Sequence, residues 1–132
     1  GVLHSVQNGL FEIGADLAAP LNAASRQHPK FITGKDVSKL EMVIDRCDQK
    51  LSPLHSFILP GGHPCAASLH LARGVTRRAE REVVGFAKKE EINPAIIAYL
   101  NRLSDLLFTL ARTVNARTNS DETLWLGRST ED

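Results

Sequence analysis

The stretch NPAIIAYLNRLSDLLFTLARTVNA, residues 93–116, decides the fold of this chain. Its apolar residues recur at every third or fourth position, which is the period of one face of an α-helix. Asn93 can cap such a helix, and Pro94 suits its first turn, where no intrahelical hydrogen bond is lost. The segment therefore predicts a long amphipathic helix with one apolar stripe, made of Ile97, Leu100, Leu103, Leu107, Leu110 and Val114.

The same period appears in two earlier segments. The first helix is expected over residues 2–18, closed by Pro20. The second should begin near Asp36 or Ser38, because either side chain can cap a helix. Residues 21–35, between them, are expected to form a loop. The recurring apolar positions of the first helix are Val2, Val6, Leu10, Ile13 and Leu17. The predicted buried stripe of the second helix is Leu40, Val43, Ile44, Cys47 and Leu51.

A third helix is expected from Pro64 to about Ala87, since Pro64 fits a first helical position. Ahead of it, residues 52–63 form a predicted loop that contains FILPGG, apolar residues followed by a sharp turn. An aromatic residue in such a loop most simply covers the core, so Phe57 is expected to plug it. Four long helices without any hairpin signal predict an all-α, up-and-down helical bundle.

The composition fits one globular domain, which we assign to residues 1–132 with a polar tail over 118–132. Hydrophobic residues make up 42% of the chain, and no apolar run approaches the roughly 20 residues of a membrane span. A net charge of +1 gives little support to a nucleic-acid or membrane-surface role. Two cysteines, Cys47 and Cys65, do not make a disulfide scaffold and indicate reduced thiols in a cytosol-like compartment.

Arginines follow one face of the predicted third helix. Arg73, Arg77 and Arg81 stand at four-residue steps, so their like charges share a face and repel one another. Solvent or carboxylates would offset the repulsion, and Glu80 lies three residues after Arg77. A bound polyanion would offset it as well, because the guanidinium fork binds phosphate oxygens bidentately. The spacing leaves both a solvated or ion-paired face and a phosphate site open.

Polar residues also interrupt the apolar stripe of the fourth helix. Arg102 and Asp105 are three residues apart and can pair with each other. The amide of Asn101 needs a partner, which is either a hydrogen bond to another helix or a ligand. None of the five histidines shows the Glu-x-x-His spacing of di-iron bundles, so we assign no metal ion to protein ligands.

Several ordered blocks of the chain point to one family. They are FILPGG at 57–62, LHLAR at 69–73, RRAER at 77–81, YLNRLSD at 99–105, LF at 107–108 and LAR at 110–112. The segment from Gln7 to Ala18 and the tail from Glu122 to Trp125 fit the same pattern. Together these blocks resemble the PduO-type ATP:cob(I)alamin adenosyltransferases over nearly the whole chain.

The resemblance implies a homotrimer of helical bundles that transfers the 5′-deoxyadenosyl group of ATP to the cobalt of cob(I)alamin and releases triphosphate. ATP would lie at the boundary between subunits, with the corrinoid in an apolar pocket above it and Mg²⁺ accompanying the triphosphate. A reductase and a cobalamin-dependent enzyme are possible further partners. The reactive cobalt belongs to the substrate, which fits the lack of an obvious side-chain nucleophile.

The resemblance also assigns roles to residues. Arg73 matches a residue that pairs with an aspartate of a neighbouring subunit, and Phe57 matches an aromatic that displaces the lower axial ligand of cobalt. Arg77, Arg73 and Phe57 are therefore the expected catalytic residues. The positions that match the family's ATP contacts are Arg77, Arg78, Glu80, Arg81 and Asn101.

The match begins inside the second of the family's five helices. The family's Thr- and Gly-rich ATP loop and the first helix, which carries the aspartate partner of Arg73, precede that point, so four helices are expected here. A corrinoid-binding or handover protein without ATP chemistry is the alternative function. A plain bundle whose arginines only join subunits is a further rival, and it predicts no apolar cavity near Phe57. The cytosol is the expected compartment, with the mitochondrial matrix as the alternative.

Overall fold

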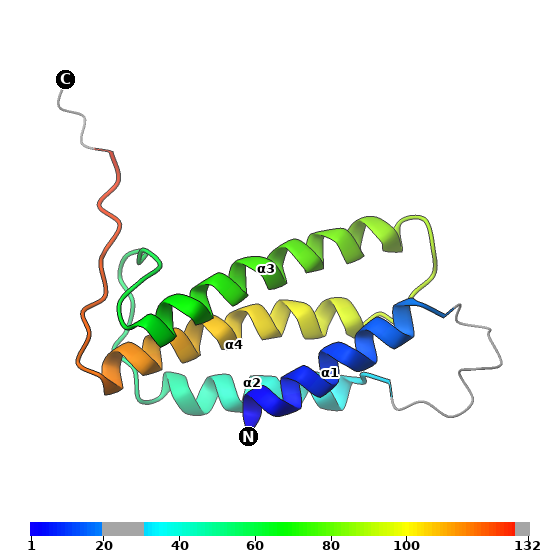
Figure 1. Cartoon of the computed structure of the whole chain (residues 1–132), viewed down its shortest axis with the longest axis horizontal. Helices are drawn as coiled ribbons and strands as arrows, with labels where there is room; N and C mark the ends of the chain where they lie inside the picture. The colour runs from blue at the N-terminus through cyan, green and yellow to red at the C-terminus, as the bar shows by residue number, and fades with distance from the viewer. Residues whose placement is uncertain (20–30, 129–132) are drawn as a thin grey trace.

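The computed structural model describes residues 1–19 and 31–128 of the chain. These residues form four helices, α1 (Val2–Leu17), α2 (Gly34–Asp48), α3 (Pro64–Ala87) and α4 (Ala95–Arg117). Successive helices run in opposite directions (Figure 1), so the predicted all-α, up-and-down bundle is confirmed. Pro20 and most of the predicted 21–35 loop lie outside the described residues.

Helix α2 begins earlier than the sequence predicted. Thr33 is its N-cap, and the backbone N–H of Thr33 donates a 2.9 Å hydrogen bond to Oδ2 of Asp36. Asp36 is thus the third helical residue of a capping box rather than the cap itself. The same hydrogen bond lowers the pKa of the Asp36 carboxyl, because it stabilises the charged form. The predicted start at Asp36 or Ser38 was therefore wrong by several residues.

Helix α4 lies at the centre of the bundle and packs against α3 and α2. Leu100, Leu103 and Leu107 of its predicted stripe are buried, and the rest of that stripe is half-buried. Leu106 lies outside the predicted stripe and is fully buried, because the central helix is covered on more than one side. The hydrophobic core is therefore built around α4.

Helix α1 covers the core less completely than predicted. Its residues Val6 and Ile13 are buried, whereas Val2 and Leu10, which share the same helical period, are 37% and 41% exposed. Only part of α1 comes close to α4, and the contact is made through a glycine. A Cβ atom on Gly9 would lie 2.6 Å from the hydroxyl oxygen of Tyr99, which is itself buried.

The predicted loop over residues 52–63 is present and pairs with the C-terminal tail. Ile58 and Leu124 form an isolated antiparallel bridge. The backbone N–H of Leu59 donates to the carbonyl of Thr123 at 2.8 Å, and that of Trp125 donates to the carbonyl of Phe57 at 2.8 Å. Figure 1 shows the two segments side by side at the end of the bundle where α4 ends. Among the described residues, no helix is long and apolar enough to cross a membrane.

We expect the substitution Gly9→Ala to destabilise the chain by about 1–3 kcal/mol, because the added methyl group forces α1 away from the buried Tyr99 ring. Gly14→Ala on the same helix is the control, since nothing lies within 4 Å of the new Cβ. That change should stabilise the chain by about 0.5–1 kcal/mol through helix propensity. Urea unfolding measures both, and equal effects of the two substitutions would contradict the close contact.

Candidate functional site

Two hollows lie one after the other along the seam between α3 and α4. The first has a volume of about 310 Å³ and is lined by Arg77, Glu80, Arg81 and Val84 of α3 and by Asn101 of α4. Nδ2 of Asn101 donates a 3.0 Å hydrogen bond to Oε1 of Glu80, so the predicted helix-to-helix hydrogen bond is confirmed. The structure thus brings four of the five predicted ATP-site residues into one hollow.

The arginines of this region are solvated. Arg77, Arg78 and Arg81 are exposed, and none of them forms an ion pair within the described part of the chain. The carboxylate of Glu80 binds Asn101, so no ion pair with Glu80 relieves Arg77. Arg78 does not line the hollow. The guanidinium groups of Arg77 and Arg81 are thus left free for an anion at the hollow, and that of Arg78 lies next to it along α3.

The polar residues of α4 behave as the sequence indicated. Nη2 of Arg102 lies 2.6 Å from Oδ2 of Asp105, which confirms the predicted ion pair. The same nitrogen donates to Oδ1 of Asn101 at 2.7 Å. The amide of Asn101 is therefore held from both sides, and its orientation toward Glu80 is fixed.

The second hollow is an apolar groove of about 700 Å³ beside the first. We call it the Phe57 groove. The loop contributes Leu54, His55, Ser56, Phe57 and Ile58, the helices contribute Arg73, Asp105 and Phe108, and the tail contributes Trp125 and Leu126. An apolar cavity near Phe57 is thus present, contrary to what a plain structural bundle predicts.

Phe57 does not plug the core, and that prediction was wrong. Its side chain is 78% exposed, and its ring meets the ring of Trp125 edge-on at a centroid distance of 6.1 Å. The reason is the backbone pairing between loop and tail. Side chains alternate along an extended segment, so Ile58 turns inward while Phe57 and Leu59 turn outward.

Arg73 lines the Phe57 groove rather than the first hollow. Its guanidinium carbon lies 4.9 Å from the centroid of the Phe108 ring, a cation–π distance. Its Nε is buried and has no hydrogen-bond partner among the residues the structure describes. Arg73 and Arg77 are one helical turn apart, so the two hollows are neighbours.

His70 lies beside the same aromatic ring. It is 8% exposed and meets the Phe108 ring edge-on at 6.0 Å. Burial lowers the pKa of its imidazole below the usual 6.5, and the nearby charge of Arg73 lowers it further, while Glu122 opposes the shift. The imidazole is therefore held neutral near the groove at pH 7.

Of the ten residues that line the Phe57 groove, only Phe57 and Arg73 were recognised from the sequence as site residues. Phe108 was noted only as part of the family resemblance, and Asp105 was assigned to an ion pair. Trp125 lies in the tail. One signal was available: Asn101, Asp105 and Phe108 follow one another at steps of four and three residues, so they share a face of α4. The contribution of Trp125 depends on tail docking, which no local pattern shows.

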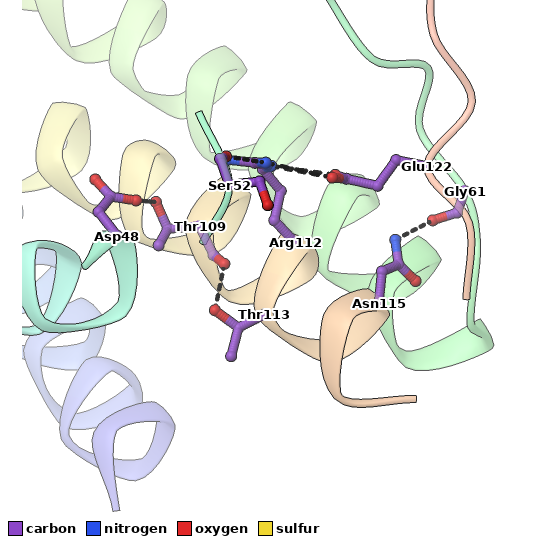
Figure 2. A network of polar contacts seen from close by, with 8 residues as sticks. All are labelled: Asp48, Ser52, Gly61, Thr109, Arg112, Thr113, Asn115 and Glu122. Atoms are coloured by element: carbon purple, nitrogen blue, oxygen red, sulfur yellow. Dashed lines mark hydrogen bonds and ion pairs between the residues drawn. The ribbon is translucent and has the colours of Figure 1, made fainter. Parts of the chain in front are cut away.

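A network of polar contacts joins Arg112 and Asn115 of α4 to the loop and the tail (Figure 2). Nε of Arg112 lies 3.1 Å from Oε2 and 3.3 Å from Oε1 of Glu122, and Nη2 donates to the carbonyl of Ser52 at 2.9 Å. One turn further, Nδ2 of Asn115 donates to the carbonyl of Gly61 at 3.2 Å. The network ties both irregular segments to α4.

Metal ligands do not gather at either hollow. In residues 1–19 and 31–128, no group of three or more His, Cys, Asp or Glu side chains could hold a metal ion.

Comparison with known proteins gives consistent matches. The family model described as cobalamin adenosyltransferase matches residues 1–114. A Bacillus subtilis corrinoid adenosyltransferase is 49% identical over 115 residues, and a human one is 39% identical over 126. These alignments cover 87% and 94% of this chain, but the chain spans only 58% and 50% of those two relatives.

Solved structures show the same similarity. A variant PduO-type ATP:corrinoid adenosyltransferase from Lactobacillus reuteri, complexed with cobalamin and ATP, matches with a TM-score of 0.87 and 38% identity. The match covers 95% of this chain and 68% of that one. Another variant of this type from the same organism, complexed with ATP, matches with the same TM-score and identity.

Proposed function

The chain belongs to the cobalamin adenosyltransferase family, and on that premise we propose that it transfers the 5′-deoxyadenosyl group of ATP to the cobalt of cob(I)alamin. The products would be adenosylcobalamin and triphosphate. The observation that carries this proposal is the adjacency of a cationic hollow and an apolar groove along one seam. Arg77 lines the first and Arg73 the second, and residues four apart on a helix are about 5–6 Å apart.

The proposed reaction is a displacement at the 5′ carbon of ATP. The electron pair of Co(I) attacks that carbon, a cobalt–carbon bond forms, the bond from the carbon to oxygen breaks, and triphosphate leaves with the oxygen. Negative charge therefore develops on the leaving group. Arg77, Arg78 and Arg81 have free guanidinium groups that neutralise it, and such electrostatic stabilisation is a large term in catalysis.

Glu80 and Asn101, which are hydrogen-bonded to each other beside these arginines, orient the nucleotide. The Asn101 amide is fixed by Glu80 and Arg102, so its position is set before a ligand arrives. Preorganised groups lose little entropy on binding. Glu80 and Asn101 thus serve as ATP-binding residues together with Arg77, Arg78 and Arg81.

The Phe57 groove would bind the corrinoid. Its rings and aliphatic side chains match the apolar face of a large macrocycle, and Phe57 is exposed enough to lie against it. In the proposed role, Phe57 occupies the side of the cobalt from which the lower axial ligand has departed. Loss of that ligand makes Co(II) easier to reduce, which supplies the Co(I) nucleophile.

A homotrimer is part of the proposal. Buried Nε of Arg73 has no partner among the described residues, as expected if an aspartate of a neighbouring subunit binds that guanidinium. On the same helix, Leu71 and Val75 are 71% and 50% exposed, and a Cβ on Gly74 would meet nothing within 4 Å. The helix face that includes Leu71, Gly74 and Val75 is thus available to another subunit.

The remaining components follow from the chemistry. Mg²⁺ would arrive with the triphosphate, whose oxygens suit it. A reductase would supply the electron for Co(II), and a cobalamin-dependent enzyme would consume the product. We place these reactions in the cytosol, with the mitochondrial matrix as the alternative.

We expect Arg77→Ala to lower the rate of adenosyl transfer by about 10²–10³-fold, because the variant loses a donor to the leaving triphosphate. Helix content should stay unchanged, since Arg77 is exposed. The measurement is the formation of adenosylcobalamin by the natural full-length chain, with Arg46→Ala on the exposed face of α2 as the control. Unaltered turnover in the Arg77 variant would remove the phosphate role. Failure of the unsubstituted chain to bind ATP would favour the handover alternative.

Substitution of the groove aromatic tests the cobalt side of the reaction. We expect Phe57→Ala to slow the reaction that starts from cob(II)alamin more than the reaction that starts from chemically pre-reduced cob(I)alamin, because only the former needs ligand displacement. Leu59→Ala, two residues away and outside the groove lining, is the control and should affect neither. Equal slowing of both reactions in the Phe57 variant would refute the displacement role.

A further inference from the structure

Two walls of the Phe57 groove are not helical. One wall is the loop that carries Phe57 and the other is the tail that carries Trp125. Two backbone hydrogen bonds join these walls to each other, from Leu59 to Thr123 and from Trp125 to Phe57. Such a short pairing is marginal on its own in water, so the position of both walls depends on what fastens them to the bundle.

Arg112 of α4 binds both walls to the bundle. It is 8% exposed, and its guanidinium binds the Glu122 carboxylate of the tail and the Ser52 carbonyl of the loop (Figure 2). A buried charge is costly unless it is paired and hydrogen-bonded. Glu122 is the one described carboxylate that pairs with it. Detachment of the tail would therefore leave the guanidinium charge unpaired.

Asn115 fastens the other end of the same loop. It is 2% exposed, its Oδ1 accepts from the backbone N–H of His63 at 2.9 Å, and its Nδ2 donates to the carbonyl of Gly61. A Cβ on Gly62 would collide with this amide, and the backbone there has a positive φ of 93°. The loop is thus pinned near both ends by residues of one helix.

We propose that Arg112 is a positioning residue for corrinoid binding, because its ion pair with Glu122 and its bond to Ser52 set the separation of the Phe57 and Trp125 walls. This inference rests on the proposed function, since it takes the corrinoid as the ligand of the groove. Arg112 is not part of the groove lining, so it acts through the two walls. The ATP hollow is built from α3 and α4 alone and does not depend on this pair.

The test substitutes Glu122 rather than Arg112, because Glu122 lies in the tail, outside the core. In the natural full-length chain, Glu122→Ala should raise KM for cobalamin about tenfold or more, the effect of losing a charge-assisted hydrogen bond, and leave KM for ATP unchanged. Arg112→Lys, which keeps the charge and loses the fork, should shift the same constant in the same direction. Asp121→Ala is the control, since this exposed neighbour makes no contact with Arg112.

A second readout does not need the reaction. Amide hydrogen exchange at Leu59 and Trp125 should become faster in Glu122→Ala, while amides of α3 and α4 keep their protection. Unchanged exchange and an unchanged KM for cobalamin would overturn the inference, as would an equal rise of both KM values. If the unsubstituted chain fails to transfer the adenosyl group, the proposed function fails, and the exchange result still decides whether Arg112 positions the walls.

Discussion

The buried charge of Arg112 determines where the irregular parts of this molecule lie. It sits on the central helix, and a guanidinium in that position is stable only with a carboxylate and further acceptors. Those partners come from segments that are far apart in the sequence, the start of the 52–63 loop and the tail. One charge is therefore bound to both segments whose aromatic residues, Phe57 and Trp125, meet at the groove.

The seam between α3 and α4 places two different environments next to each other. On α3, Arg73 lines the Phe57 groove, and Arg77 and Arg81 line the polar hollow. On α4, Asp105 and Phe108 line the groove, and Asn101 lines the hollow. A reaction between a large apolar nucleophile and a polyanionic substrate requires this kind of adjacency. The helices hold the polar half rigidly, while the shape of the apolar half depends on the loop and the tail.

Much of the fold follows from local pattern. The apolar period predicts the helices and the central place of α4, because a repeat of 3.6 residues is a property of the segment itself. The predictions that failed depend on partners distant in sequence. Phe57 was expected in the core, and its pairing with a tail more than sixty residues away turns it outward. Leu10 fits the helical period, but α1 covers too little of α4 to bury it.

The candidate site, like the fold, could be predicted only in part from the sequence. The arginine row is evident from spacing, yet spacing alone does not distinguish a solvated face from a phosphate site. The structure adds that these arginines lack ion pairs among the described residues and that Asn101 meets Glu80 across two helices. The individual catalytic roles were assigned through the family resemblance, because helical spacing describes where side chains lie and not what they bind.

In the proposed function, the groove between Phe57 and Trp125 binds a corrinoid. Trp125 is the only tryptophan of these 132 residues, and the corrin ring absorbs in the range where tryptophan emits. Titration of the chain with cobalamin, followed by Trp125 fluorescence, is therefore the most direct measurement. We expect saturable quenching at a one-to-one ratio of corrinoid to chain. Attenuation that only follows the absorbance of added cobalamin, as in a mixture with free tryptophan, would contradict it.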